Sequence, residues 1–317
     1  MKKILSLVLA FTTVLQAFAL DNIKVDTAFT NGAAPVVARI GLAVSVNAGM
    51  TELLKSSIDE WRPDHSAQDS WPSRHTSWAY TFASIVTHET MHHSGWWSFG
   101  ANVLAAGVGA QRVLSSSHFP KDVIGGMWVG RVSTEVGYAL ASLIFPGSRK
   151  ALPDGAADWQ PSVDISTGAM YTLGGGTPES DARIGMNTAI TFTMPVDDRW
   201  GFATSLTLRS VPLYWRHDGR FSDMLNGAGI ALGPVANLSL PWRRWSCELR
   251  ALGGIVRHFD GQGNRCGNYG CIVDLSAAGI CRISSSLAMG AQVGYGLWTM
   301  HRPIQSLSAA TFTRVYF

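Results

Sequence analysis

Cationic and imidazole side chains recur in three short clusters within the first half of the chain. The clusters are Lys55, six residues and then Arg62-Pro63; Pro72-Ser73-Arg74-His75; and Arg112, five residues, His118, three residues and Asp122. A phosphate group with nearly two negative charges requires cationic hydrogen-bond donors around its oxygens. Lys55, Arg62 and Arg112 are donors of that type, so the clusters indicate a site for phosphate chemistry.

The two histidines and the aspartate are suited to moving a phosphoryl group. An imidazole can attack phosphorus, and a carboxylate on its other ring nitrogen fixes the tautomer and orientation, a role that fits His118 with Asp122. A second imidazole must protonate the leaving oxygen, and His75 is the candidate. Ser73 stands where a helix is expected to begin, so its hydroxyl and the following N–H groups add an anion cradle. Spacing alone does not distinguish the nucleophile from the acid.

Together the three clusters resemble the type 2 phosphatidic acid phosphatase superfamily, whose pattern is K-x6-R-P, P-S-G-H and S-R-x5-H-x3-D. The resemblance covers roughly residues 35–146 and implies a phosphatase-type helical bundle. It also implies a phosphohistidine intermediate on His118, with His75 as the general acid. Hydrolysis would be independent of metal ions and would use no cofactor. The residues that the resemblance assigns to phosphate binding are Lys55, Arg62, Ser73, Arg74 and Arg112.

Two positions depart from the superfamily pattern. Arg74 stands in place of the glycine, whose missing side chain lets the backbone approach phosphate closely. Arg74 either crowds the cradle or adds another donor. Gln111 replaces the serine before Arg112 and keeps a group that forms hydrogen bonds. Structural roles also stay open at this point, such as an ion pair of Arg62 with Asp59 or Asp64.

A competing motif, His88-Glu89-Thr90-Met91-His92, matches H-E-x-x-H, the helix signature of zinc peptidases. His88 and His92 would share one helical face, with Glu89 as the base. The extended form of the motif needs a histidine at position 98, which is Ser98. The alternative is an exposed, histidine-rich helix end.

Apolar residues recur at spacings of three and four from about Gly32 to Phe145, which predicts helices. We expect helices near 40–58, 73–85, 99–112 and 122–145. Charged residues such as Arg39, Arg131 and Glu135 interrupt the apolar stretches, so no clean transmembrane span is expected. The predicted helical domain is 20–150, with a linker at 151–159.

From Gln160 onward the apolar period changes to two, which is typical of strands in a membrane barrel. We expect eight strands, at 161–173, 183–195, 200–212, 227–240, 245–258, 271–283, 286–298 and 306–317. The connections alternate between short and long. The last strand ends at Phe317, and this ending resembles the C-terminal strand of bacterial outer-membrane proteins, where a terminal aromatic residue helps recognition by the barrel assembly machinery. Residues 160–317 are therefore predicted to form an eight-stranded antiparallel transmembrane β-barrel, filled by side chains rather than open as a pore.

Composition and the N-terminus place the predicted domains in the cell. Lys2 and Lys3, an apolar stretch and Ala17-Phe18-Ala19 form a predicted signal peptide over 1–19. With its two lysines removed, a formal charge of +3 falls to +1, which gives no support to nucleic-acid binding. An even number of strands puts both barrel ends, and with them the helical domain, in the periplasm. Export also allows cysteine pairing, and we predict Cys266–Cys271.

The sequence thus predicts an outer-membrane-tethered phosphatase that hydrolyses phosphate monoesters or pyrophosphates. Its expected substrates are lipids, with lipid A phosphate, isoprenyl pyrophosphate and phosphatidylglycerol phosphate as candidates; soluble phosphoesters stay open. The expected partners are this substrate, the bacterial outer membrane and, during biogenesis, the barrel assembly machinery. The alternative is a non-catalytic outer-membrane structural or adhesion protein with a degenerate phosphatase site.

Overall fold

A computed structural model describes residues 33–91, 93–145, 159–240, 244–265, 269–299 and 302–317. The predicted signal peptide, most of the predicted linker, His92 and Cys266 lie outside these residues. The predicted Cys266–Cys271 pair therefore stays a prediction.

Four helices form the first half of the described chain, in the order that the apolar periodicity predicts. They are α2 (Ala33–Ser57), α3 (Arg74–Thr90), α4 (Gly95–Leu114) and α5 (Pro120–Ile144). The helix starts have local causes: Ser94 caps α4 by accepting a hydrogen bond from the Trp96 N–H, and Pro120 occupies the first turn of α5. Helices α3 and α5 pack closely because α5 presents Gly126 and Gly130 at the contact, where an added Cβ would meet the backbone along the first half of α3.

The second half is a closed barrel in which every neighbouring pair of strands is antiparallel, and β1 pairs with β9 to close it. The strands are β1 (Ser162–Gly176), β2 (Ser180–Ala182), β3 (Gly185–Pro195), β4 (Trp200–Trp215), β5 (Phe221–Ser239), β6 (Trp245–Phe259), β7 (Gly270–Arg282), β8 (Leu287–Trp298) and β9 (Arg302–Tyr316). The three-residue β2 only bridges β1 and β4 at one rim, so the predicted eight-stranded barrel is confirmed. Strands β4 and β5 extend further than predicted, into the expected loop between them.

Two rims of this barrel differ in their connections. One rim, called here the short-turn rim, carries the β3–β4 turn at 196–199 and the β7–β8 turn at 283–286, together with the start of β1 and the end of β9. The opposite, long-loop rim carries β2, the β4–β5 connection and the β6–β7 connection around Asp260. The β1–β3 and β6–β7 connections of the long-loop rim, at 177–184 and 260–269, are longer than the turns of the opposite rim. The β4–β5 and β8–β9 connections, at 216–220 and 299–301, are about as short as those turns, so the predicted alternation in length holds in part. Both ends of the barrel sequence lie at the short-turn rim.

Charged and polar side chains fill the barrel interior. Arg314 lies between Asp164 and Glu248, and Arg250 binds the same two carboxylates at 2.9 Å. All four side chains are buried, with two positive and two negative charges in mutual contact. A cavity further along the lumen has a volume of about 40 Å³, room for little more than one or two water molecules. The interior is thus filled, as predicted for an eight-stranded barrel.

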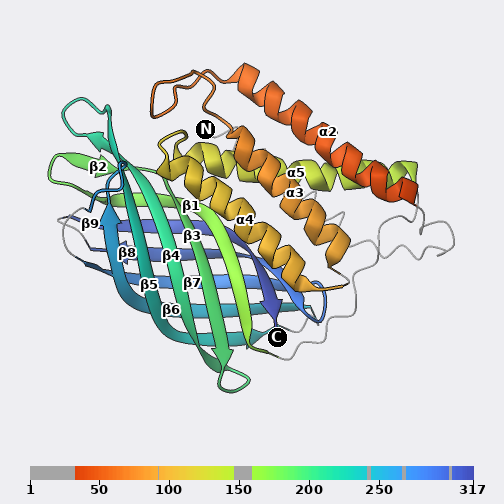
Figure 1. Ribbon diagram of the computed structural model, residues 1–317. Helices are drawn as coiled ribbons and strands as arrows, with labels where there is room; N and C mark the ends of the chain where they lie inside the picture. The colour runs from red at the N-terminus through yellow and green to blue at the C-terminus, as the bar shows by residue number, and fades with distance from the viewer. Residues whose placement is uncertain (1–32, 92, 146–158, 241–243, 266–268, 300–301) are drawn as a thin grey trace.

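The helices lie along the outer wall of the barrel rather than beyond one of its rims (Figure 1). Helices α4 and α5 contact β1, β3, β4 and β9. Val113 and Val123 from the helices share an apolar cluster with Met186 and Met224 of the barrel. This lateral packing joins the two predicted domains through a side-by-side interface that the sequence pattern did not predict.

One described helix, α2, is long and apolar enough over Ala34–Ser57 to cross a membrane, with a mean hydropathy of 1.2. This differs from the expectation of no clean span, which rested on the charged residues, such as Arg39, that interrupt the apolar stretches. In the structure Arg39 is buried and pairs with Glu89 at 3.1 Å, so its charge is balanced inside the bundle.

Candidate active site

Four helix ends meet at one end of the bundle, and the three sequence clusters lie there. The end of α2 supplies Lys55, the start of α3 supplies His75, and the end of α4 supplies Arg112. His118 precedes α5, whose first turn holds Asp122. The backbone N–H of Ser73 donates to the carbonyl oxygen of Asp122 at 2.9 Å, which ties the start of α3 to the start of α5.

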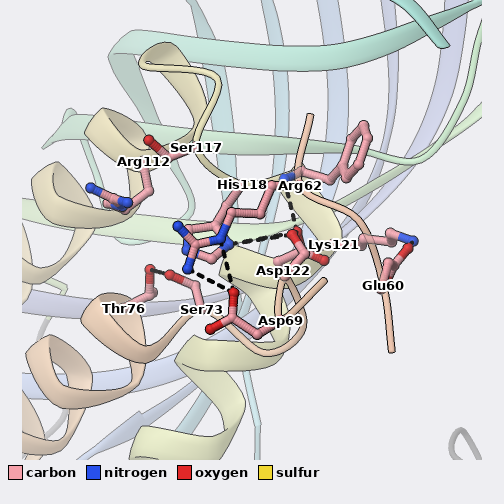
Figure 2. Close-up of polar contacts among 12 residues, drawn as sticks. Glu60, Arg62, Asp69, Ser73, Thr76, Arg112, Ser117, His118, Lys121 and Asp122 are labelled. Carbon is pink, nitrogen blue, oxygen red and sulfur yellow. Dashed lines mark hydrogen bonds and ion pairs between the residues drawn. The ribbon is translucent and has the colours of Figure 1, made fainter. Parts of the chain in front are cut away.

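His118 is almost fully buried and faces a carboxylate. Its Nδ1 lies 3.7 Å from Oδ2 of Asp122 and 3.5 Å from Oγ of Ser70. The same Asp122 oxygen accepts hydrogen bonds from Ser70 Oγ at 2.5 Å and from the Phe119 N–H at 2.9 Å. Asp122 is therefore held by two hydrogen bonds and faces Nδ1 of His118 (Figure 2), whose Nε2 lies on the far side of the ring.

Lys55 and Arg62 share one anionic partner, Asp69. Arg62 donates from Nη2 to Oδ1 of Asp69 at 2.9 Å (Figure 2). Nζ of Lys55 lies 3.6 Å from Oδ2 of the same carboxylate. Burial raises the pKa of Asp69, but the attraction of Lys55 and Arg62 outweighs it and leaves the pKa below its usual value. The two cations, Lys55 and Arg62, thus converge on one carboxylate, that of Asp69. The alternative pairing of Arg62 with Asp59 or Asp64 is not the one observed.

The Arg74 side chain turns away from this cage. Its Nη2 lies 2.9 Å from Oε1 and 3.0 Å from Oε2 of Glu52, and both side chains are exposed. Arg74 therefore neither crowds the cradle nor points into it in this conformation. The departure from the glycine pattern is accommodated because Glu52, on the neighbouring α2, holds the guanidinium at the surface.

Ser73 and Arg112 line the same region. Ser73 is buried at the start of α3, and its Oγ accepts a hydrogen bond from Thr76 Oγ1 at 3.0 Å rather than capping the helix. Arg112 leaves its buried Nε without a hydrogen-bond partner. A buried, unpaired guanidinium nitrogen is costly unless a ligand supplies the acceptor. Arg112 is therefore placed and available to bind an anion.

His75 is exposed at the mouth of the site. Partial burial lowers its pKa below the usual histidine value, and the positive charges of Arg112, His118, Arg62 and Arg74 lower it further. Because the charges of these groups lower its pKa, His75 lies near the same cations that surround the expected phosphate. A neutral imidazole at the free site gains a proton more readily when a phosphate dianion binds beside it.

The H-E-x-x-H motif lies at the opposite end of α3, away from these residues. Nε2 of His88 is 2.6 Å from Oε1 of Glu135, and Glu89 binds Arg39 and the Tyr138 hydroxyl. Among the residues that the structure describes, no three His, Cys, Asp or Glu side chains are grouped to hold a metal ion. Glu89 serves here as the partner of a buried arginine.

Three contributors to the site were missed by sequence reasoning: Ser70, Asp69 and Glu52. Ser70 is buried and holds Asp122, Asp69 clamps two cations, and Glu52 diverts Arg74. None of them belongs to the fixed spacing of the motifs. Only the position of Asp69 and Ser70, shortly before Pro72-Ser73, offered a signal.

We expect restoring the motif glycine, Arg74→Gly, to change kcat/KM by less than about fivefold, because Arg74 pairs with Glu52 at the surface and an exposed ion pair contributes about 1 kcal/mol at most. Steady-state phosphate release by the two proteins measures this. An increase of about tenfold or more would show that Arg74 obstructs the cradle.

Gly126 of α5 sets the distance between the two halves of the site. A Cβ at this position would lie 2.5 Å from the Ser73 carbonyl oxygen and 3.1 Å from the Ser77 nitrogen. We expect Gly126→Ala to lower the free energy of unfolding by about 1–3 kcal/mol and to reduce kcat/KM, since α3 must move from α5. Urea unfolding and phosphate release measure the two effects. Gly100→Ala, where the added Cβ meets nothing within 4 Å, is the matched control, and equal behaviour of the variants would refute the prediction.

Comparisons with known proteins identify a family for the helical half of the chain. Residues 36–145 match the PAP2 superfamily. A curated relative, the lipid A 1-phosphatase of Porphyromonas gingivalis, is 29% identical over 233 residues, which is 69% of this chain and 52% of the relative. The chain thus spans about half the length of that relative. Because 233 residues exceed the whole sequence before the barrel, the likeness also includes part of the barrel.

Several solved outer-membrane proteins resemble the barrel half. They include Neisserial surface protein A, at 11% identity over 49% of this chain and 97% of that chain, with a TM-score of 0.38. The attachment invasion locus protein Ail of Yersinia pestis matches at 11% identity over 50% and 99%, with a TM-score of 0.30. OprG of Pseudomonas aeruginosa matches at 8% identity over 52% and 98%, with a TM-score of 0.35. That the barrel is closed is shown by the pairing of β1 with β9 in this chain, and not by these likenesses. The chain carries a PAP2 superfamily domain at residues 36–145, followed by a closed eight-stranded antiparallel β-barrel.

Proposed function

We propose that this protein is an outer-membrane phosphatase that removes phosphate from lipids through a phosphohistidine on His118. The observation that carries the proposal is the arrangement of buried His118 beside Asp122, at the helix ends that also bring Lys55, Arg62 and Arg112 together. Residues 36–145 supply this machinery, and their membership of the PAP2 superfamily supports a phosphatase reaction.

The proposed reaction has two displacements at phosphorus. In the first, Nε2 of His118 attacks, the bond between phosphorus and the leaving oxygen breaks, and His75 gives that oxygen its proton. In the second, water attacks the phosphohistidine, His75 takes a proton from the water, and the P–N bond breaks to release phosphate. Asp122 holds the Nδ1 side of the ring throughout, and the nearby cations stabilise charge on the phosphoryl oxygens.

The barrel is proposed to lie in the outer membrane. Its outward side chains over strands β4 to β9 are apolar and at least 45% exposed at Leu206, Leu232, Leu249, Leu275, Val293 and Leu307. Its interior holds Asp164, Glu248, Arg250 and Arg314. An apolar outside and a polar inside are the reverse of a water-soluble barrel and fit a lipid surround.

The substrate class is proposed to be a phosphorylated membrane lipid. The relative named as a lipid A 1-phosphatase supports lipid A phosphate, and a membrane-held enzyme meets lipids at high local concentration. Isoprenyl pyrophosphate and phosphatidylglycerol phosphate are the other members of the test panel. The non-catalytic alternative was motivated by Arg74, which the structure pairs with Glu52 outside the cage.

Phosphate release by the refolded full chain tests this proposal. The panel contains lipid A, isoprenyl pyrophosphate, phosphatidylglycerol phosphate and a soluble aryl phosphate, each with and without a chelator. We expect chelator-resistant release, fastest on one of the lipids. Arg62→Ala, which removes one cation of the cage, should raise KM for every active substrate. Release from no member of the panel would contradict the proposal, and so would release that depends wholly on metal ions.

A further inference from the structure

Helix α4 runs the full height of the barrel wall. At its start, the Gly95 N–H donates to Ser286 Oγ at 3.3 Å, and the Trp96 ring lies 6.0 Å from the ring of Phe317. Ser286 and Phe317 belong to the short-turn rim. The 20 residues of α4 correspond to about 30 Å, close to the thickness of a membrane hydrocarbon core.

The other end of the helical domain reaches the long-loop rim, and the candidate active site is at this end. The Phe119 ring, next to His118, packs edge-on against Phe221 at the start of β5, with centroids 5.2 Å apart. A Cβ at Gly261 in the β6–β7 connection would lie 3.5 Å from Oγ of Ser116. Burial raises the pKa of Tyr214 at the end of β4, and the nearby positive charge of Lys121 opposes that shift. The phosphate site therefore lies beside the long-loop rim.

The outward surface of the helices divides by height. Leu104, at the midpoint of α4, is 73% exposed, and Phe82, at the midpoint of α3, is 53% exposed. The exposed ionisable residues of the four described helices, by contrast, all lie within six residues of a helix end at the active site: Glu52, Arg74, His75 and Lys121. Ionisable groups further down pair with one another: Arg39 with Glu89, and His88 with Glu135, whose side chains are 23% and 32% exposed.

The apolar middle of the helices continues the apolar band of the barrel. Helices α4 and α5 sit directly on β1, β3, β4 and β9, so the two surfaces share one wall (Figure 1). If lipid surrounds the barrel, as proposed above, it must also meet the outer face of these helices at the same depth. Hydrocarbon chains fit this surface because burying an exposed leucine or phenylalanine is favourable, and because the charged residues near the middle of the described α5, Arg131 and Glu135, are only partly exposed.

We propose that the helical domain is embedded in the outer membrane beside the barrel and that its phosphate site opens at the headgroups of the outer leaflet. Short turns face the periplasm and long loops face outward in barrels of this type, so the long-loop rim marks the outer leaflet. The inference rests on the proposed function for its substrate, which becomes a lipid phosphate presented from the outer leaflet. It differs from the periplasmic placement expected from the sequence, and the labelling experiment below distinguishes the two.

The path of the chain agrees with this orientation. Helix α2 ends at the active site, so its start lies at the level of the short-turn rim, and α5 starts at the active site and ends at that same level. Strand β1 then begins at the short-turn rim. An exported chain would thus enter and leave the membrane from the periplasmic side.

Labelling of Lys121 on intact cells tests the orientation without any assay of turnover. Lys121 has a side chain 45% exposed at the active-site end, whereas Lys55 is 5% exposed. The probe is an amine-reactive polymer too large to pass a porin, and peptide mapping locates the label. We expect label on Lys121 in intact cells at the level seen after the outer membrane is disrupted. Label that appears only after disruption would overturn the proposal.

A matched pair of variants controls this experiment. Lys121→Arg keeps the charge and should remove the label. Adding Asp198→Lys to that variant places an exposed lysine in the β3–β4 turn of the short-turn rim, and this lysine should react only after disruption. The reverse pattern would show that the long-loop rim faces the periplasm. An inactive enzyme with the expected labelling would contradict the proposed function and leave the orientation supported.

Depth is tested with a spin label at Leu104→Cys in full-length protein whose native cysteines are serine, reconstituted in phosphatidylcholine vesicles. Leu232→Cys on the barrel wall is the lipid reference, and Gln262→Cys in the β6–β7 connection is the water reference. We expect the label at 104 to resemble that at 232, accessible to oxygen and protected from a water-soluble nickel chelate. Resemblance to the label at 262 would show that the helices lie in water and would overturn the proposed embedding.

Discussion

Replacing His118 with glutamine is expected to lower kcat for phosphate release by about 10⁴-fold or more, because the variant lacks the attacking nitrogen. Glutamine keeps most of the volume of a side chain that is 1% exposed, so the site should remain folded. His65→Gln is the matched control, since His65 is an exposed histidine on the loop between α2 and α3. Steady-state phosphate release with the preferred lipid measures both variants.

The same experiment separates a nucleophile from a binding residue. A loss confined to KM would place His118 among the groups that hold phosphate and would contradict the proposed mechanism. Ser70→Ala provides an intermediate case, because it removes a hydrogen bond to Asp122 and leaves the His118 side chain itself unchanged. We expect a smaller loss of kcat in Ser70→Ala than in His118→Gln.

Replacing His75 with glutamine is expected to lower the rate of the first displacement by about 10²–10⁴-fold for a lipid phosphate, because the poor leaving oxygen then lacks a proton donor. With nitrophenyl phosphate the loss should be much smaller, since nitrophenolate leaves without a proton. Single-turnover measurements on both substrates report this difference. Equal losses on the two substrates would show that His75 is not the general acid.

The pH dependence carries a signature of the same residue. A general acid works while protonated, so kcat/KM should fall as pH rises through the pKa of His75 in the free enzyme. That pKa is lowered by partial burial and by Arg112, His118, Arg62 and Arg74, so the decline begins below the usual histidine value. In the bound complex the phosphate dianion favours the imidazolium, and kcat should decline at higher pH than kcat/KM. This decline with rising pH should be absent in His75→Gln.

The motifs predicted the composition of the site better than its contacts. Fixed spacing placed His118 four residues before Asp122, where a helix starts, and the start of α3 after Ser73 followed from local rules. Asp69 and Ser70 were not predicted, because their roles depend on how the irregular 58–73 segment folds back onto α5. The fate of Arg74 was open for the same reason, since Glu52 lies on a different helix.

The barrel was predictable from alternation, because inward Arg250 and outward Leu249 and Ala251 follow the pleat of a strand. The lateral packing of helices on the wall was not predictable from that pattern. Outward residues of β1 and β9 read as lipid-facing, yet Val315 is fully buried against Gly95 of α4. Periodicity gives the face of a strand and leaves open whether lipid or protein covers it.

Trapping the phosphorylated enzyme tests the central claim most directly. Enzyme mixed with a ³²P-labelled substrate is quenched in denaturant during turnover, and mass spectrometry locates the modified residue. The account predicts an acid-labile, alkali-stable phosphoryl group on His118. It should accumulate in His75→Gln supplied with nitrophenyl phosphate, whose leaving group needs no proton, and it should be missing in His118→Gln. Steady phosphate release with no label on His118, or with label on another residue such as Ser73, would contradict it.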